Sequence, residues 1–590
     1  MMRMNILRCL ALAGCVGVLP ALAADKNWQP VPGPLQTRWA KDVSPTKVWP
    51  EYPRPQMVRK EWMNLNGLWD YAIVATNAPA PHSYEGQILV PFPVESSLSG
   101  VGRRLDEFHD LFYRRTVKIP RGWKGERVLL HFGAVDWETE VFVNGSPVGT
   151  HRGGYDPFSF DITGALKSGR TQEIVVKVFD PTEGGQPHGK QVRKPRGIMY
   201  TSSSGIWQTA WLEPVPQTSI AELAITPDVD SGVVRIFTPS GQQDATVEAV
   251  ALANGQEVGR DSGPLGGELK IPVPNPTLWS PEHPFLYDLK VELRQGKKRV
   301  DAVTSYFAMR QLGLEKDDKG ITRPTLNGKP MFLLGPLDQG FWPDGLYTAP
   351  TEAAMRYDLE MTKKLGFNMT RKHVKVEPEL WYYECDRLGL MVFQDMPAGD
   401  NKTAAQKEEF EHELKQMILT HYNHPCIVLW VIFNEGWGQY DTERLTSMVK
   451  EMDPWRGVDD ATGWTDKKVG DVIDMHKYPG PASPQPEETR AAVLGEFGGL
   501  GLGLDGHTWA KKSWGYQGMT DRKALTDRYV DLLTKTLELK ASPGLSAAVY
   551  TQITDVETEC NGLMTYDREI VKPDLDAVST ANRKLWEDNK

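Results

Sequence analysis

The fold is decided by the stretch Cys426-Ile427-Val428-Leu429-Trp430-Val431-Ile432-Phe433, which runs directly into Asn434 and Glu435. An almost unbroken apolar run of this length is typical of a strand that is buried on both faces of a parallel sheet. Gly436-Trp437-Gly438 follows, and its glycines permit a tight turn of the backbone. A carboxylate placed directly after such a strand loses hydration, so we expect Glu435 to have a chemical role.

The segments around this strand repeat its pattern. From residue 311 to residue 590, helical patterns of 10 to 18 residues alternate with short apolar runs, which indicates βα units and a parallel sheet. Roughly eight units in about 280 residues predict a (β/α)8 barrel. The expected strands are 332–334, 368–372, 391–394, 427–433, 458–461, 472–475, 492–495 and 547–552, and the expected helices are 352–365, 378–388, 404–421, 442–452 and 523–539.

The chain upstream of the barrel has a different texture. Residues 24–215 show short alternating runs separated by turn dipeptides such as Asn144-Gly145, which predicts a β-sandwich. Residues 216–310 form a second, smaller β region whose size suits an immunoglobulin-like sandwich. The expected protein is therefore multidomain, with two sandwiches ahead of a C-terminal barrel.

The N-terminus has the pattern of a signal peptide over residues 1–23. Arg3 and Arg8 precede a short apolar run, and Ala21-Leu22-Ala23 forms a small-residue cleavage site. We therefore expect a periplasmic or secreted protein without a transmembrane span. The alternative is a lipid anchor on Cys15, because Leu12-Ala13-Gly14-Cys15 resembles a lipoprotein cleavage site. Cys385, Cys426 and Cys560 lack disulfide or metal spacing and are expected to be buried thiols.

Charge and motif content exclude several classes of function. The formal net charge is -10, and no basic stripe is present that could bind nucleic acid. No glycine loop or lysine is placed to cradle a phosphate, which disfavours a nucleotide-dependent enzyme. The 19 tryptophans are compatible with sugar stacking, although most tryptophans in a large protein fill cores.

A second glutamate follows another apolar run. Ala492-Val493-Leu494-Gly495 leads to Glu496, and Gly498-Gly499 comes next. The structural alternative for one such residue is a salt-bridged glutamate at a strand end, but two of them before glycine-rich loops favour a functional pair. The 61 residues between Glu435 and Glu496 correspond to about three βα units, which places the pair near strands four and seven. There they would face each other at the barrel mouth.

Two facing carboxyl groups suit the cleavage of glycosidic bonds. One carboxyl donates a proton to the leaving oxygen while the other stays ionised and attacks the anomeric carbon. A retaining route requires the two groups to lie about 5–5.5 Å apart.

The chain resembles glycoside hydrolase family 2 over essentially its whole mature length. The motifs that carry the resemblance are Leu65-Asn66-Gly67-Leu68-Trp69, Gly153-Gly154-Tyr155-Asp156-Pro157-Phe158, Ser204-Gly205-Ile206-Trp207, His424-Pro425 leading to Asn434-Glu435, and Gly495-Glu496. The family includes β-galactosidases, β-glucuronidases and β-mannosidases. The resemblance implies a sugar-binding jelly roll, an immunoglobulin-like sandwich and a catalytic barrel, in this order.

The resemblance also implies roles for individual residues. Glu435 is similar to the family's acid/base, Glu496 to its nucleophile, and Asn434 to a residue that binds the sugar 2-hydroxyl. Tyr478 resembles the tyrosine that holds the nucleophile. The remaining expected substrate-binding or orienting residues around it are His373, Arg371 and His476, for which the structural alternatives are a buried histidine and an ordinary ion pair.

Other positions depart from the better-known members of the family. After the first barrel strand the chain reads Gly335-Pro336-Leu337-Asp338-Gln339-Gly340-Phe341-Trp342, so Asp338, Gln339 and Trp342 are expected to line the subsite without roles that can be copied. The Asn-x-Lys element with which β-glucuronidases hold a carboxylate is not evident. Gln552 and Asp555 are expected hydroxyl ligands after the last strand. Candidate stacking platforms are Trp437, Trp464, Trp509 and Trp514, two of which we expect to be core residues.

We therefore expect a retaining exo-β-glycosidase that acts on an oligosaccharide or glycoside. A neutral sugar is favoured over a uronic acid, with a β-galactoside as the weak favourite. The alternatives are a β-glucuronidase or arabinosidase of the same family, and a carbohydrate-binding protein without catalysis. The chemistry requires no cofactor, and no metal-ligand cluster is evident. A structural cation, or a hydroxyl-binding cation near the site, is left open. The oligomeric state is left open.

Overall fold

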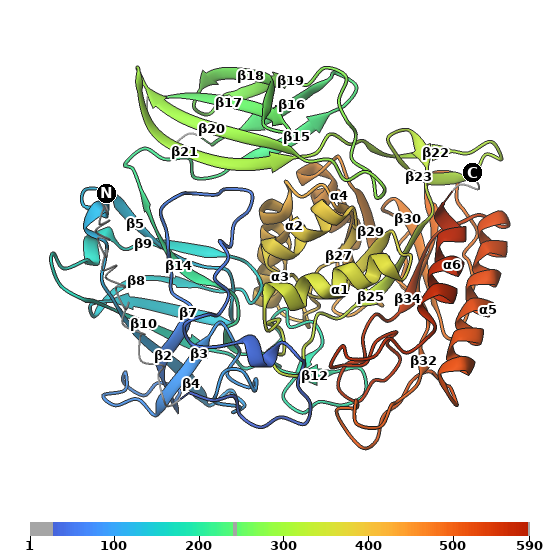
Figure 1. Cartoon of the computed structure of the whole chain (residues 1–590), viewed down its shortest axis with the longest axis horizontal. Coiled ribbons are helices and arrows are strands. Elements are labelled where there is room, and N and C mark those ends of the chain that lie inside the picture. Colours follow the sequence, from blue (N-terminus) through green and yellow to red (C-terminus); the bar gives the residue numbers. More distant parts are fainter. Residues whose placement is uncertain (1–27, 240–244, 588–590) are drawn as a thin grey trace, which may run out of the picture.

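The computed structural model describes residues 28–239 and 245–587, which form three β-rich or α/β parts. In Figure 1 the first sandwich lies at lower left, the second sandwich lies at the top, and the barrel occupies the centre and right. The three parts follow the order of the chain, and this confirms the expected fold class.

The first sandwich packs a four-stranded sheet against a six-stranded sheet, with orders β1-β14-β5-β9 and β3-β2-β4-β10-β7-β8. Asn144 and Gly145 both have positive φ values (53° and 82°), as the tight turn between β7 and β8 requires. The main strands are β1 Met63–Asn64, β2 Gly67–Ala75, β3 Gly86–Val90, β4 His109–Val117, β5 Arg127–Phe132, β7 Glu138–Val143, β8 Ser146–His151, β9 Phe158–Asp161, β10 Gln172–Phe179 and β14 Ala210–Val215. Shorter pairings join β6 Val135–Asp136 to β13 Gly205–Ile206, and β11 Gln191–Val192 to β12 Tyr200–Thr201.

The second sandwich has seven strands in sheets of three and four, with orders β15-β16-β19 and β18-β17-β20-β21. Alternate residues of its strands point into one apolar core, as in Tyr287, Leu289, Val291 and Leu293. The strands are β15 Ala224–Asp228, β16 Val233–Phe237, β17 Thr246–Ala253, β18 Gln256–Pro264, β19 Glu268–Pro272, β20 Tyr287–Gln295 and β21 Lys298–Phe307. A small sheet of β22 Leu312–Lys316, β23 Thr322–Leu326 and β24 Lys329–Pro330 leads into the barrel.

The barrel is a parallel sheet in the order β29-β28-β27-β26-β25-β34-β31-β30, and its end strands β29 and β30 lie against each other. The strands are β25 Leu333–Asp338, β26 Met369–Lys372, β27 Met391–Asp395, β28 Ile427–Asn434, β29 Gly457–Thr462, β30 Val472–Lys477, β31 Ala491–Gly498 and β34 Leu545–Thr551. The helices are α1 Glu352–Lys364, α2 Glu379–Leu388, α3 Ala404–His421, α4 Thr442–Met452, α5 Arg522–Ala541 and α6 Leu575–Trp586. A short pair, β32 Leu500–Gly501 and β33 Gln517–Gly518, lies between β31 and α5.

All eight expected barrel strands and all five expected helices are present, with ends shifted by a few residues. The expected placement of the two glutamates is confirmed, because β28 is the fourth barrel strand and β31 the seventh. One difference concerns Glu496, which lies inside β31 instead of after it. The apolar pattern stops at Gly495, whereas the strand pairing continues to Gly498.

Several expectations concern thiols and the N-terminus. Cys385, Cys426 and Cys560 are buried and unpaired, as expected. Among residues 28–239 and 245–587, no helix combines the length and the apolar character that crossing a bilayer needs. The expected signal peptide and the alternative anchor on Cys15 lie outside the described residues.

The second sandwich is joined to the barrel through Asp386, a fully buried residue of α2. Tyr306 Oη of β21 donates to its Oδ2 (2.7 Å), and Cys426 N, just before β28, donates to its Oδ1 (2.7 Å). His424 Nδ1 lies 2.7 Å from Oδ2, and Trp279 Nε1 donates to the Asp386 carbonyl (2.8 Å). One carboxylate therefore ties the second sandwich to the strand that carries Glu435.

Removing this carboxylate should destabilise the protein. In Asp386→Ala, Tyr306 Oη and Cys426 N lose their buried acceptor, so the free energy of unfolding should fall by about 3–5 kcal/mol. Thermal and urea unfolding would measure the change, with Asp288→Ala on the exposed face of β20 as the matched control. Equal stability of the two variants would contradict the role given to Asp386.

Candidate active site

Glu435 lies at the carboxyl end of β28, at the first residue of the following loop. Its φ of 51° is in the left-handed region, which residues other than glycine rarely adopt. Its backbone N–H donates to Thr462 O at the end of β29 (3.1 Å). Its side chain keeps 14% of its surface exposed, so the carboxylate faces the barrel mouth and can be reached from it.

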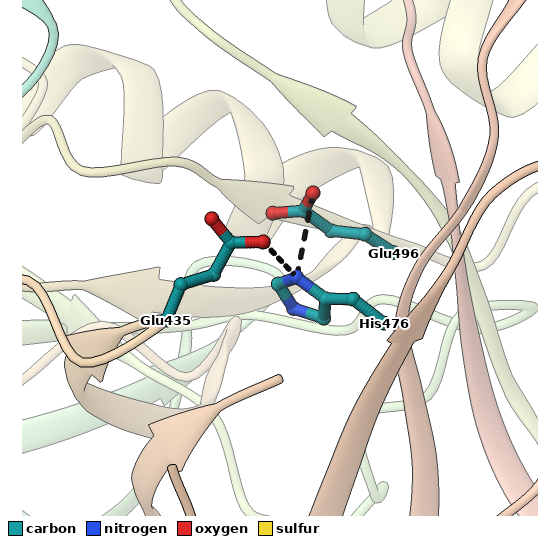
Figure 2. Close-up of side chains that lie close together, drawn as sticks. All are labelled: Glu435, His476 and Glu496. Carbon is teal, nitrogen blue, oxygen red and sulfur yellow. Dashed lines mark hydrogen bonds and ion pairs between the residues drawn. The ribbon is translucent and has the colours of Figure 1, made fainter. Parts of the chain in front are cut away.

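Glu496 faces the same mouth from β31, with only 8% of its side chain exposed. Tyr478 Oη donates to its Oε2 (2.5 Å), and Arg371 Nη1 donates to its Oε1 (3.3 Å). An oxygen of Glu435 and an oxygen of Glu496 lie within 4.8 Å of each other. Figure 2 shows the two carboxylates pointing toward one another from different strands.

Arg371, in β26, connects the strands that carry this pair. Its guanidinium is fully buried and binds both carboxylate oxygens of Asp395 at the end of β27 (2.9–3.2 Å). It also donates to Asn434 Oδ1 in β28 (2.9 Å), to Thr462 Oγ1 in β29 (3.2 Å) and to Gly495 O in β31 (3.1 Å). Arg371 therefore fixes the ends of four other strands relative to one another.

His476, in β30, lies between the two glutamates (Figure 2). Its Nδ1 is 2.8 Å from Glu435 Oε1 and 3.6 Å from Glu496 Oε2, and its Nε2 is 3.6 Å from Asp474 Oδ1. Burial opposes a charged ring, but Glu496, Glu435 and Asp474 outweigh it and raise the pKa of His476. We therefore treat His476 as an imidazolium at neutral pH.

The charge state of Glu496 follows from its neighbours. Burial alone would raise the pKa of Glu496, but His476, His373 and Arg371 outweigh burial and lower this pKa to about 2. Glu496 is therefore an ionised carboxylate across the working pH range, as a nucleophile must be.

The same cluster contains three side chains that could bind a metal ion. Within the part of the chain that the structure describes, one group of three such residues has its donor atoms within 4.8 Å of one another: Glu435, His476 and Glu496. His476 Nδ1 is already hydrogen-bonded to Glu435, and the charges of the imidazolium and the carboxylates compensate each other. We interpret the cluster as a carboxylate–imidazolium network instead of a metal centre.

Comparison with known proteins agrees with this geometry. Residues 104–208 match the description "Glycosyl hydrolases family 2, sugar binding domain", residues 219–310 match "Glycosyl hydrolases family 2", and residues 325–494 match "Glycosyl hydrolases family 2, TIM barrel domain". Together these matches span more than half of the chain. The chain belongs to glycoside hydrolase family 2.

Named relatives within family 2 differ in their specificity. A β-galactosidase of Thermoanaerobacter pseudethanolicus is 29% identical over 360 residues, which cover 56% of this chain and 45% of the relative. A putative β-glucuronidase of Formosa agariphila is 30% identical over 364 residues, which cover 58% and 42%. The matches thus span less than half the length of these two relatives. The solved β-D-glucuronidase of Dictyoglomus thermophilum shares the fold, with a TM-score of 0.73, 18% identity, and coverage of 91% of this chain and 100% of that one.

Three expected residues of this family 2 site lie beside the glutamate pair. Asn434 Oδ1 accepts from Arg371 and from Thr462 Oγ1 (2.8 Å), and among the described residues nothing accepts from its amide nitrogen. Tyr478 Oη also contacts Thr551 Oγ1 (2.8 Å). His373 Nδ1 lies 3.1 Å from Asp395 Oδ2, which orients its ring. The amide of Asn434 is thus free to donate to a sugar hydroxyl.

Other expected residues have different partners. Asp338 lies opposite Lys372 in the strand register, and Lys372 Nζ donates to its carboxylate (2.6 Å). Because neighbouring residues of a strand point to opposite faces, Lys372 and its partner Asp338 lie on the face away from Arg371. Trp342 packs in the core under the guanidinium of Arg568, 3.9 Å from the ring centroid. The strand was expected to end at residue 334 but continues to Asp338, and Trp342 lies in the loop beyond it, so the sequence did not reveal the direction of either side chain.

The expected hydroxyl ligands after the last barrel strand also have hydrogen-bond partners within the protein. Gln552 is fully buried and donates to Asn561 Oδ1 (2.8 Å), and Asp555 accepts from Lys572 Nζ (2.6 Å). Gln339 is buried, and neither end of its amide has a partner among the described residues. Gln552 Oε1 and Asp555 Oδ2 also lack a partner, and among the described residues neither side chain hydrogen-bonds to Glu435 or Glu496.

Of the four tryptophans expected as stacking platforms, two lie near Glu435 or His476 and two pack against tyrosines. Trp464 is 67% exposed and meets His476 edge-on, with ring centroids 5.8 Å apart, so it is available at the mouth. Trp437 lies half-buried in the loop after Glu435. Trp509 and Trp514 instead pack edge-on against Tyr566 and Tyr516, respectively.

Sequence reasoning missed several members of the site. Asp395 ends an expected strand, so the strand-end argument used for Glu435 could have found it. Tyr516, which stacks on Tyr478 with centroids 3.8 Å apart, comes from a loop without a periodic signal. Lys190 comes from the first sandwich, and its charge contributes to the low pKa of Glu496.

Replacing the imidazolium should change the pH dependence of activity. In His476→Gln, the pKa of Glu496 should rise toward its ordinary value of 4.5, so the acid limb of kcat/KM should move up by about one pH unit or more. The sign follows because Glu496 must be ionised to attack. Profiles on an activated aryl glycoside would measure the shift, with His507→Gln, whose ring contacts Asp567, as the control. An unmoved acid limb would refute the role of His476.

Proposed function

We propose that the protein is a retaining exo-β-glycosidase that hydrolyses terminal sugars by double displacement. The observation that carries the proposal is the approach of Glu435 and Glu496 to within 4.8 Å between carboxylate oxygens. A retaining mechanism needs a separation of about 5–5.5 Å, whereas an inverting one leaves about 6.5–9.5 Å for a water molecule. The spacing therefore supports direct attack by one carboxylate on the sugar.

In the first step Glu496 attacks the anomeric carbon and Glu435 protonates the departing oxygen. The low pKa of Glu496 supports its role as nucleophile, and the hydrogen bonds from Tyr478 and Arg371 orient its two oxygens. Glu435 is more exposed than Glu496, which suits a group that must meet the leaving group and later a water molecule. In the second step Glu435 takes a proton from that water while the water oxygen attacks the anomeric carbon, and the bond between this carbon and Glu496 breaks to release the sugar.

The first sandwich supports action on terminal sugars. Its loop at residues 186–192 docks beside the barrel mouth, where His188 N–H donates to Ala398 O (2.9 Å) beyond β27. Tyr200 Oη donates to Glu559 Oε2 (2.5 Å), and Thr201 N donates to Glu557 Oε1 (2.8 Å) beyond β34. These contacts wall one side of the mouth, which favours a pocket for one terminal sugar over an open cleft.

The alternative of a carbohydrate-binding protein without catalysis is disfavoured. A binding site needs no ionised carboxylate held beside an imidazolium, and burying such charges without a chemical use costs free energy. The named relatives include a β-galactosidase and a putative β-glucuronidase, so they support either specificity for this protein.

We further propose that the protein acts in the periplasm or after secretion, on the evidence of the N-terminal sequence pattern.

Removing the nucleophile should abolish turnover. Glu496→Gln keeps the shape of the side chain but cannot form the glycosyl-enzyme, so kcat should fall by about 10⁴-fold or more. Steady-state assays on a panel of aryl β-glycosides and α-L-arabinosides would measure the loss. Activity within tenfold of the wild type would remove Glu496 as the nucleophile.

Removing the acid/base should produce a loss that depends on the leaving group. In Glu435→Ala, substrates with poor leaving groups should lose about 10²–10⁴-fold in kcat/KM, because they need a proton. Dinitrophenyl glycosides should be much less affected in kcat/KM, because their leaving group needs little protonation. Equal losses on both substrates would show that the two roles are misassigned.

A further inference from the structure

Lys190 is a buried cation at the contact between the first sandwich and the barrel. It lies directly before β11, and only 6% of its surface is exposed. Among residues 28–239 and 245–587, no hydrogen bond or ion pair engages its ammonium group, whose recorded neighbour is the ring of Tyr200, 5.8 Å away at the centroid. A lysine that is buried over most of its surface and whose ammonium group has no fixed acceptor is unusual, because lysines in such places are normally paired.

The position of Lys190 is fixed by the docking of its loop. His188 N and Gly189 N both donate to Ala398 O (2.9 and 3.1 Å). Gly189 has a φ of 58°, and a Cβ there would lie 2.3 Å from Val374 O, so only glycine permits this approach. Tyr200 N also donates to Lys190 O (2.9 Å). The backbone of Lys190 is therefore held against the barrel before any ligand arrives.

Lys190 lies next to the site residues at the end of β26, because the preceding Gly189 packs against the carbonyl oxygen of Val374, which directly follows His373. Its charge also acts on Glu496 and His373. It also acts on Glu559, but both oxygens of this carboxylate already accept hydrogen bonds, from Tyr200 Oη (2.5 Å) and Asn561 Nδ2 (2.9 Å). The carboxylate of Glu559 is thus bound by other donors, and the ammonium group of Lys190 is available to a ligand.

We propose that Lys190 is a specificity-determining residue that the first sandwich contributes to the sugar site, where it binds the carboxylate of a uronic acid. The proposal rests on the proposed function, since it concerns the sugar whose anomeric carbon Glu496 attacks. A carboxylate is the substituent that best compensates a buried ammonium, through a charge-assisted hydrogen bond. A neutral sugar offers only hydroxyl oxygens, which compensate the charge less well.

This assignment changes the sugar expected from the sequence. The preference for a neutral sugar rested partly on the missing Asn-x-Lys element of the barrel. Lys190 supplies an equivalent charge from a different domain, in a loop that no barrel motif would reveal. The site therefore has a means of selecting a uronide without that element.

The test compares matched substrates that differ only at C6. Wild type, Lys190→Met and Lys194→Met are assayed on aryl β-D-glucuronide against β-D-glucoside, and on β-D-galacturonide against β-D-galactoside. Lys194 is exposed in the same loop and serves as the control. Wild type should prefer a uronide, and K190M should lose on the order of 100-fold more in kcat/KM on that uronide than on the matched neutral glycoside.

A binding measurement covers substrates that turn over slowly. Calorimetric titration of Glu496→Gln, with and without K190M, against the same four glycosides should show that the lysine strengthens uronide binding only. Equal losses on charged and neutral sugars would assign Lys190 to support of Glu496 and overturn the proposal. Wild-type cleavage of neutral glycosides alone would also overturn it, but would leave the proposed function intact. Failure to cleave any glycoside, by a folded protein, would instead contradict the proposed function.

Discussion

The buried guanidinium of Arg371 is the contact on which the active site depends. It has no exposed surface, and its five donors reach Asp395, Asn434, Thr462, Gly495 and Glu496 on four other barrel strands. The planar fork of arginine suits such a role, because it offers several donors in one fixed plane. Asp395 compensates the charge with both oxygens, which lets the guanidinium remain buried. The relative placement of Glu435 and Glu496 is a consequence of this network.

The electrostatics of the site follow from the same arrangement. Arg371 and His476 keep Glu496 ionised, and the same nitrogen of His476 that approaches Glu496 also contacts Glu435. Retaining hydrolysis asks two neighbouring carboxylates to play different roles, and their environments must therefore differ. Here the difference is visible in burial and partners: Glu496 is enclosed by Tyr478 and Arg371, whereas Glu435 stands at the start of an open loop. The first sandwich adds a third cation, Lys190, from outside the barrel.

The sequence revealed those features that one strand or one motif carries. Continuous apolar runs predicted the barrel strands, and the ends of β28 and β31 located Glu435 and Glu496. The direction of side chains beyond the expected ends of the strands could not be predicted in this way. Trp342 was expected at the sugar but packs on Arg568, and Asp338 was expected beside it but pairs with Lys372. Lys190 was missed because its place in the site depends on the docking of two domains, which no local pattern encodes.

The central claim is that two glutamates less than 5 Å apart cleave a glycoside with retention. Proton NMR of the first sugar released from the aryl β-glycoside that the enzyme cleaves fastest tests it most directly. The account predicts that the β-anomer forms first and then mutarotates to the equilibrium mixture. First release of the α-anomer would show that water, and not Glu496, attacks the anomeric carbon, and would contradict the account.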